Sequence, residues 1–421
     1  MFFTEEIKYE QIQKILLEPI ESIETGYNFG GVKFVEQKNL LFVAARYRDE
    51  SGGLIEDRWS NAQGAVHVYA KQGETFVYNQ KIVSSDVELG DHFGSSISLS
   101  DDGDILVVAA SGEDPDNVDG SGAVYVFEYQ NGTYVQTQKL QPSNPEPNKS
   151  FGYYIDASSD GNLIAITSIR GDGELTFRVY VFEKQGTNFV QTQEIVPSQL
   201  EGFSFFGDGV KISHDNNFLV IPQRSADIGG VINAGRVCVY EKQNGIFVET
   251  QVLQEEAPIS NYDIFGTSVA ISSDDSLIYI GGQNSDKAAT NAGAVFVYKK
   301  VNNAWSLDYE IFSDDLSANL FGYKLSLSQD DRHLIVGAVT DSDVDSGSGA
   351  AYVFSKKSGK MKQVEKILPD YTGETSDGSN GQSFGERVDV SGDGSLVFVA
   401  SPREAGLGVE DLGALYILKR A

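Results

Sequence analysis

The sequence predicts an all-β fold in which seven copies of a four-stranded antiparallel unit close into a ring. A Phe-Gly pair recurs seven times in the 421 residues, and neighbouring pairs lie 55 to 64 residues apart. That spacing accommodates four short strands and their turns. The intervening segments show the alternation of strands and lack the 3.6-residue period of helical repeats. The pairs begin at Phe29, Phe93, Phe151, Phe206, Phe265, Phe321 and Phe384.

Residues 93–140 contain the clearest copy of this unit. SSISLS alternates and predicts a first strand, after which Asp102-Gly103 supplies a tight two-residue hairpin turn. The apolar run ILVVAA is short and bounded by turn residues, which indicates a strand buried on both faces. A polar loop follows, and AVYVFEY and TYVQTQKL then give the third and fourth strands.

The turn and the opening of the third strand recur in other copies. Asp-Gly returns at 160–161 and 393–394, and Asp-Asn or Asp-Asp takes its place elsewhere because Asp and Asn also visit the left-handed region. A glycine before the third strand indicates close approach of the backbone to the next unit. That glycine occurs at Gly64, Gly122, Gly293, Gly349 and Gly413.

The two ends of the chain are expected to share the seventh unit. After Phe384 the chain has room for only three strands, whereas residues 1–18 contain a Gln-Lys-Ile triplet that aligns with the fourth strands of the other units. The N-terminal strand therefore completes the last unit, and residues 1–421 form one domain without open sheet edges. The alternative is a helix over residues 8–21, which contain good helix formers.

Composition and charge limit the classes of partner. The net charge of −29 disfavours nucleic acid and anionic membrane surfaces as partners, although acidic surfaces also serve solubility alone. No run of 18 apolar residues predicts membrane insertion, and the N-terminus lacks the pattern of a signal peptide. The single cysteine, Cys238, lies in an alternating apolar run and is expected to be a packing residue.

The repeated Phe-Gly, Ser-Asp-Gly, Val-Val-Ala-Ala, Gly-Ala-Val-Tyr-Val-Phe and Gln-Lys-Leu segments resemble the FG-GAP repeat family over essentially the whole chain. The resemblance implies a seven-bladed β-propeller, as in integrin α-subunit heads and microbial surface proteins, and an extracellular or cell-surface location. It implies adhesion or ligand binding more often than catalysis. Integrin-like members bind calcium in the turn between the first two strands, but the SDDGD turn here is too short to supply six to eight oxygen ligands.

The longer loops are expected at one end of the ring, and they are acidic. Asp341, Asp343 and Asp345 alternate before Gly347, so a curled loop can bring them to one calcium ion. A second candidate set of calcium ligands is Asp114, Asp116 and Asp119, and further acidic loop residues are Glu113, Glu404, Glu410 and Asp411. The alternative for both sets is a solvated acidic loop without metal, and no other cofactor is indicated.

A tryptophan and three arginines mark the corresponding loop of the first unit. Trp59 is accompanied by Arg46, Arg48 and Arg58, and an aromatic ring among guanidinium groups can stack on a sugar or anchor a protein contact. Trp59 can instead fold back over its own unit. The longest loop of this kind therefore offers a candidate ligand-binding site.

No motif predicts catalysis. The four histidines lack metal-ligand spacing, and neither a Gly-x-Ser-x-Gly elbow nor a phosphate-binding loop occurs. The sequence therefore favours a non-catalytic binding or adhesion module that presents its acidic loops to a protein or glycan. An architectural subunit of a larger assembly and a polysaccharide-active enzyme remain as alternatives, and the oligomeric state is not indicated.

Overall fold

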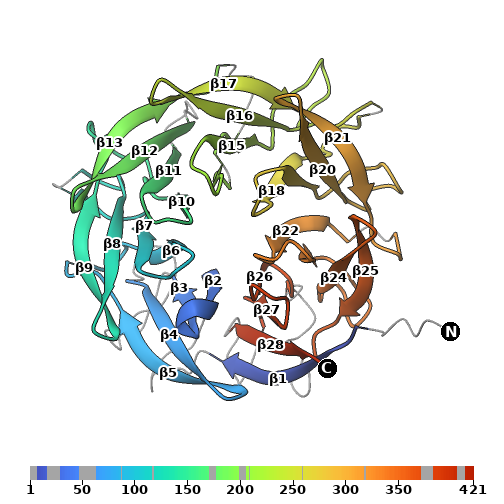
Figure 1. The fold of residues 1–421 in the computed structure, drawn as a ribbon, viewed down its shortest axis with the longest axis horizontal. Coiled ribbons are helices and arrows are strands. Elements are labelled where there is room, and N and C mark those ends of the chain that lie inside the picture. The colour runs from blue at the N-terminus through green and yellow to red at the C-terminus, as the bar shows by residue number, and fades with distance from the viewer. Residues whose placement is uncertain are drawn as a thin grey trace.

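Seven four-stranded antiparallel sheets surround a central axis in the computed structural model (Figure 1). The structure describes residues 7–16, 29–46, 63–86, 88–115, 118–169, 177–198, 205–207, 209–257, 259–316, 319–370, 383–404 and 413–421. In each sheet the strands follow one another from the axis to the circumference. The seven-bladed β-propeller predicted from the sequence is therefore confirmed, and blades are numbered by their Phe-Gly pairs.

The strands have the following bounds. Blade 1 contains β2 (Phe29–Val35), β3 (Leu40–Ala45), β4 (Ala65–Gln72) and β5 (Thr75–Ile82), and blade 2 contains β6 (Phe93–Leu99), β7 (Ile105–Ala110), β8 (Ala123–Gln130) and β9 (Thr133–Leu140). Blade 3 contains β10 (Ile155–Ala157), β11 (Leu163–Ile169), β12 (Phe177–Gln185) and β13 (Asn188–Ile195), and blade 4 contains β14 (Lys211–Ile212), β15 (Phe218–Gln223), β16 (Arg236–Gln243) and β17 (Ile246–Leu253). Blade 5 contains β18 (Phe265–Ile271), β19 (Leu277–Gly282), β20 (Ala294–Val301) and β21 (Ala304–Ile311), and blade 6 contains β22 (Phe321–Leu327), β23 (His333–Ala338), β24 (Ala350–Lys357) and β25 (Lys360–Ile367). Blade 7 contains β26 (Arg387–Val390), β27 (Leu396–Ser401), β28 (Ala414–Arg420) and β1 (Tyr9–Leu16).

The N-terminal strand closes the ring. β1 pairs antiparallel with β28, from Tyr9 opposite Arg420 to Leu16 opposite Ala414. The Tyr9 hydroxyl also donates to the Gly394 carbonyl at 2.7 Å, which fixes the strand to the turn of its own blade. The closure prediction is confirmed, and the alternative helix is wrong over residues 9–16, because pairing with β28 outweighs the weak helix propensity of this segment.

The Phe-Gly pairs at Phe93, Phe321 and Phe384 lie where two blades meet. The Phe93 ring is fully buried and packs on Tyr125 of the same blade, with 5.7 Å between the ring centroids. Phe93 also bridges to Gly64 of blade 1, where a Cβ atom would lie 2.0 Å from the Phe93 carbonyl oxygen. Gly64 has φ +81°, so both its conformation and its surroundings require glycine. The close approach expected from the Gly-Ala pattern is therefore present.

The turns between the first two strands are longer than the predicted two-residue hairpins. In blade 2 the Ser100 amide donates to the Ile105 carbonyl at 3.0 Å, so residues 101–104 form the loop. The Ser100 hydroxyl then donates to Asp102 at 2.6 Å, and the Asp104 amide donates to the same carboxylate. Equivalent Ser-Asp bonds occur at Ser158–Asp160, Ser213–Asp215, Ser272–Asp274, Ser328–Asp330 and Ser391–Asp393. These aspartates therefore close turns, which explains part of the negative charge.

The apolar core is divided into clusters between neighbouring blades. Phe42 of blade 1 and Leu106 of blade 2, for example, belong to one cluster and are fully buried. Cys238 is also buried, and its burial raises the pKa of its thiol to about 12, as expected of a packing residue. Among the described residues, no helix has the length and hydropathy needed to cross a membrane.

Candidate functional site

The two kinds of long loop meet at one end of the ring. In blade 2 the loop between β7 and β8 contacts the segment that leads into blade 3. The Asn148 amide donates to the Asp119 carbonyl at 2.8 Å, and the Ser150 amide donates to the Gly120 carbonyl at 3.0 Å. The loops between second and third strands and the loops that enter each blade therefore form one surface, which we call the long-loop face.

In blade 6 a lysine lies among the predicted metal ligands. The Lys366 ammonium, from β25, lies 2.7 Å from carboxylate oxygens of Asp315, Asp341 and Asp343. Tyr352 of β24 faces Lys366 in the sheet and donates its hydroxyl to Asp315 at 2.8 Å and to Asp341 at 3.0 Å. The carboxylates converge as the sequence suggested, but they converge on a cation that the chain itself supplies.

Ion pairs and hydrogen bonds within the blade 6 cluster shift the pKa values of Lys366 and Asp315. Burial disfavours the charged form of Lys366, but the carboxylates outweigh burial and raise its pKa. Burial likewise opposes ionisation of Asp315, whereas hydrogen bonds from Lys366, Tyr352 and Ser313 lower its pKa to about 2. The cluster is therefore charged at neutral pH, with the ammonium at its centre.

Calcium does not fit between these carboxylates while Lys366 is in place. A divalent cation there would lie next to the ammonium and would share the same oxygens. Within the described ranges, no group of three or more His, Cys, Asp or Glu side chains has a geometry suited to a metal ion. Calcium-assisted ligand binding therefore stays a prediction, and it would require the Lys366 ammonium to move out of the cluster.

Blades 2 and 7 contain related clusters. Lys139 of β9 lies 2.8 Å from Glu113 and 2.8 Å from Asp86, and its ammonium lies 5.4 Å from the centroid of the Tyr125 ring. In blade 7, Lys14 of β1 pairs with buried Glu404, which also accepts a hydrogen bond from the Tyr416 hydroxyl at 2.8 Å. We call these three groups the Tyr–acid–Lys clusters. Each ties the loop between the second and third strands to the outer strands of its blade.

The clusters lie on one side of the ring. A tyrosine on the third strand faces a lysine on the fourth strand in blades 2, 6 and 7. The equivalent cross-strand pairs in blades 3, 4 and 5 are Tyr180–Glu194, Cys238–Val252 and Phe296–Glu310. Blade 1 has the pair His67–Lys81. In blades 1 and 3, most of the loop between the second and third strands lies outside the described residues. Blades 6, 7, 1 and 2 are consecutive, so the clusters occupy one arc of the long-loop face.

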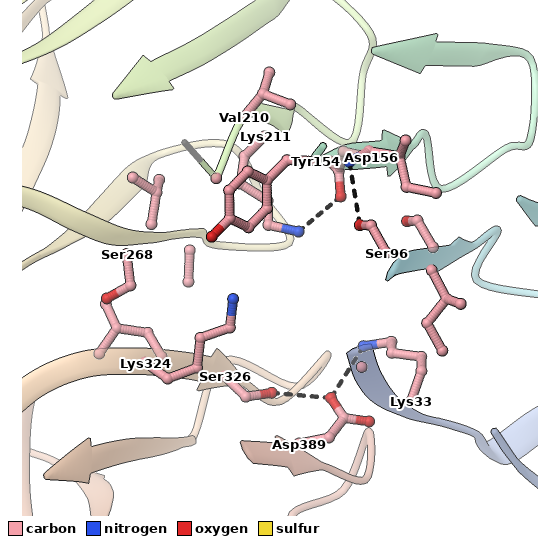
Figure 2. A pocket seen from close by; sticks show the side chains of 18 of the residues that line it. Lys33, Ser96, Tyr154, Asp156, Val210, Lys211, Ser268, Lys324, Ser326 and Asp389 are labelled. Atoms are coloured by element: carbon pink, nitrogen blue, oxygen red, sulfur yellow. Dashed lines mark hydrogen bonds and ion pairs between the residues drawn. The ribbon is translucent and has the colours of Figure 1, made fainter. Parts of the chain in front are cut away.

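A second candidate site lies on the axis of the ring. A cavity of about 510 Å³ is lined by the innermost segments of all seven blades. Figure 2 shows Lys33, Lys211 and Lys324 directed into this cavity from blades 1, 4 and 6. Lys33 lies 3.1 Å from Asp389, and Lys211 lies 2.7 Å from Asp156, so two of the lysines form ion pairs with the preceding blade. The axial cavity is therefore polar and charged.

Two segments of the chain match the FG-GAP repeat family, residues 76–127 and 305–354. Each match begins in the fourth strand of one blade and ends in the third strand of the next. FG-GAP repeats are therefore present in two parts of this seven-bladed ring. No curated protein matches the sequence significantly.

Solved structures resemble this FG-GAP propeller in fold. A putative 6-phosphogluconolactonase from Bacteroides uniformis has 12% identity and a TM-score of 0.56 over 90% of this chain and 99% of its own. The periplasmic gluconolactonase of Pseudomonas aeruginosa has 17% identity and a TM-score of 0.50 over 80% and 84%. The RRP9 WD40 repeats have 9% identity and a TM-score of 0.57 over 99% and 100%. At these identities the likeness concerns the fold alone.

The structure places some of the predicted site residues of the FG-GAP propeller. Asp341 and Asp343 join the blade 6 cluster, whereas Asp345 is exposed and accepts the Ser346 amide within its own loop. Asp114 and Asp119 are exposed, and Asp114 accepts the Gly120 amide at 2.6 Å. Arg46 lines the axial cavity. Asp116, Arg48, Arg58, Trp59, Glu410 and Asp411 lie outside the described residues.

Sequence reasoning missed the lysines of both sites. Lys14, Lys139 and Lys366 occupy the middle of the Gln-Lys-Ile, Gln-Lys-Leu and Glu-Lys-Ile triplets, which served only to align the fourth strands. Their position opposite a third-strand tyrosine is a signal that could have indicated the ion pairs. Lys33 and Lys211 occupy alternating positions of first strands, whose side chains face the axis.

Proposed function

We propose that the protein is a non-catalytic binding module whose ligand contacts the long-loop face over blades 6, 7, 1 and 2. The FG-GAP propeller fold supports a binding or scaffold module in general. The observation that carries the finer proposal is that the three Tyr–acid–Lys clusters of the described residues, in blades 6, 7 and 2, all lie in this arc. A protein or a glycan is the expected ligand, and adhesion is the corresponding biological role.

The clusters support binding because they fix loops whose tips stay exposed. In blade 6, Asp341 is 1% exposed at the base of its loop, whereas Val344 at the tip is 46% exposed. A loop that is already ordered loses less conformational entropy when a ligand binds. Rigid scaffolds that present surface loops commonly serve recognition. The arc therefore combines accessible side chains with a fixed base.

Charge favours a ligand with basic groups. Asp114, Asp119, Asp343 and Asp345 are all exposed on the long-loop face. Complementary charges across an interface increase the rate of association and favour the correct partner. The candidate residues of blade 1 other than Arg46, namely Trp59, Arg48 and Arg58, belong to the same arc by sequence and would supply aromatic and hydrogen-bonding contacts.

Two matched variants test the location of the site. Val344 in blade 6 and Ile232 in blade 4 are both large apolar residues, both 46% exposed, in loops between second and third strands. The purified full chain would be applied to a glycan array and to candidate surface proteins, and each bound ligand would be titrated against wild type, Val344→Glu and Ile232→Glu. Weaker binding of Val344→Glu, with wild-type affinity for Ile232→Glu, supports the arc. Equal effects of both variants would refute this location, and turnover of a screened polysaccharide would refute the non-catalytic function.

An architectural subunit is the second candidate, and the outer edge of blade 4 favours it. Ile246, Val248 and Val252 on β17 are 52%, 38% and 40% exposed. An edge strand with exposed apolar side chains can pair with another protein. This function predicts co-purification with a partner at fixed stoichiometry, which Val248→Lys on the same strand should abolish. A monomer in native extracts would count against it.

A further inference from the structure

The wall of the axial cavity carries positive charge, although the protein as a whole has a net charge of −29. Among the described residues, three carboxylates line the cavity, those of Asp101, Asp156 and Asp389. Six lysine and arginine side chains of the described ranges line it, those of Lys33, Arg46, Lys211, Arg224, Lys324 and Arg387. The cavity therefore has the sign opposite to that of the whole chain, and this local charge cannot follow from composition.

The two aspartates beside the lysines are largely buried where they line the cavity. The Asp389 side chain is 4% exposed, and its second oxygen accepts the Phe34 amide at 2.7 Å. The Asp156 side chain is 9% exposed, and its second oxygen accepts the Ile212 amide at 2.9 Å. Each aspartate therefore joins two blades through a backbone hydrogen bond and holds one lysine.

The paired lysines remain accessible from the cavity. The Lys33 side chain is 46% exposed and the Lys211 side chain is 41% exposed, about ten and five times the exposed fractions of their aspartate partners. An ammonium group has three donors, so an ion pair with one carboxylate leaves donors for another acceptor. The nearby Asp389 carboxylate raises the pKa of Lys33 and keeps it charged. A molecule in the cavity would therefore meet two ammonium groups that are more exposed than their carboxylate partners.

Lys324 adds a third ammonium from another side. It belongs to β22 of blade 6, whereas Lys33 and Lys211 belong to blades 1 and 4. Figure 2 shows all three side chains around the same space, with Asp156 beside Lys211 and Asp389 beside Lys33. Three donors from separate blades favour a ligand that carries more than one anionic group. A volume of about 510 Å³ is in the range of small-molecule sites.

We propose that the axial cavity binds a small molecule with two or more carboxylate or phosphate groups, held by Lys33, Lys211 and Lys324. The acidic exterior and the size of the cavity exclude long polyanions such as nucleic acids. This site is independent of the proposed function, because the three lysines that hold the ligand lie on first strands at the axis and not in the long loops of blades 6, 7, 1 and 2. Loss of one activity would leave the other intact.

The test uses citrate and inorganic pyrophosphate as probes in titration calorimetry with the full chain. Sodium chloride at matched ionic strength controls for screening. The variants are Lys324→Met, Lys324→Gln and the charge-neutral double change Lys211→Met with Asp156→Asn. Lys299→Met is the matched control, because Lys299 is an exposed lysine on β20 outside the cavity. Thermal melts without probe establish that each variant is folded.

Saturable binding of either probe by wild type, weakened about tenfold by each cavity variant and unchanged in Lys299→Met, supports the proposal. Binding of pyrophosphate alone identifies phosphate as the ligand group, and binding of citrate alone identifies carboxylate. No heat beyond the sodium chloride control would overturn the proposal. Equal weakening in Lys299→Met, or wild-type affinity in folded Lys324→Met and Lys324→Gln, would also overturn it.

Discussion

Replacing Tyr9 by alanine tests whether the N-terminal strand closes the ring as firmly as a strand inside the chain. Tyr9 in blade 7 and Tyr134 in blade 2 occupy the same position of the fourth strand. Their exposed fractions are 6% and 5%, and each hydroxyl donates at 2.7 Å to the carbonyl of a turn glycine in its blade. The two sites differ in chain connectivity and in the ring contacts that Tyr134 makes with Phe42 and Tyr129, so Tyr134 is a reference for burial and for the hydroxyl hydrogen bond.

The expected cost follows from burial and from one hydrogen bond. Truncating a buried aromatic side chain to alanine costs about 3–5 kcal/mol of folding free energy. Removing only the hydroxyl, as in Tyr9→Phe, costs about 1 kcal/mol for the lost hydrogen bond. If β1 is held as firmly as β9, the alanine variants at Tyr9 and Tyr134 lose similar stability, and so do the two phenylalanine variants.

The assay is urea denaturation of all four variants, with unfolding monitored by circular dichroism. Native-state hydrogen exchange of the β28 amides is measured in addition. Exchange reports on β28 directly because β1 covers its outer edge. Comparable shifts at both tyrosines, with protected β28 amides in wild type, support firm closure. A loss below about 1 kcal/mol for Tyr9→Ala, beside the full loss for Tyr134→Ala, would show that β1 frays and would refute the reasoning.

The ionisable clusters give three further predictions. Lys366→Met leaves buried Asp341 without its cation and should cost about 3–5 kcal/mol in a denaturation experiment, whereas wild type should melt at the same temperature in EDTA and in millimolar calcium. A calcium-dependent rise in the wild-type Tm would contradict the assignment of the ammonium to this position. The pKa of Asp315 is lowered to about 2, so the stabilising contribution of its carboxylate should be present above pH 3.8 and disappear as the pH falls toward 2. The difference in Tm between wild type and Asp315→Asn should therefore shrink over that pH range. Burial raises the pKa of Glu255 to about 7 against the hydrogen bond from Ser285, so wild type should lose stability as the pH rises from 4.5 through 7, and Glu255→Gln should lack that part of the pH dependence.

Repeated contacts made the fold predictable from the sequence. The Phe-Gly pairs, the glycine before most of the third strands and the Gln-Lys-Ile triplet each mark a packing contact that recurs around the ring. Because closure needs an N-terminal strand beside β28, residues 9–16 could be assigned despite their helix propensity. The turns were less predictable. The prediction took Gly103 as the residue that sets the turn and overlooked Ser100. The Ser100 side chain hydrogen-bonds to Asp102 and to the Ile105 amide, and the loop is longer as a result.

The candidate sites depend on contacts that the spacing of residues along the chain does not reveal. Asp341 and Asp343 were expected to converge, but Asp315 enters from the preceding loop and Lys366 from the fourth strand. A pattern of carboxylates alone cannot distinguish a bound metal from a lysine as the cation. The axial site could not be predicted from spacing along the chain either, since its lysines come from three different blades and meet only when the ring closes.

Blade 4 indicates what the Tyr–acid–Lys clusters contribute. It has Cys238 and Val252 where blade 6 has Tyr352 and Lys366, yet both blades form the same four-stranded sheet. The fold therefore does not require the ion pairs, and buried ion pairs often stabilise a protein no more than apolar groups of similar size. Their geometric effect is to fix one conformation of a loop, as Asp341 does at the base of the blade 6 loop. We expect fixed loops on consecutive blades in a surface that recognises a ligand. A surface that only completes the ring would not need them.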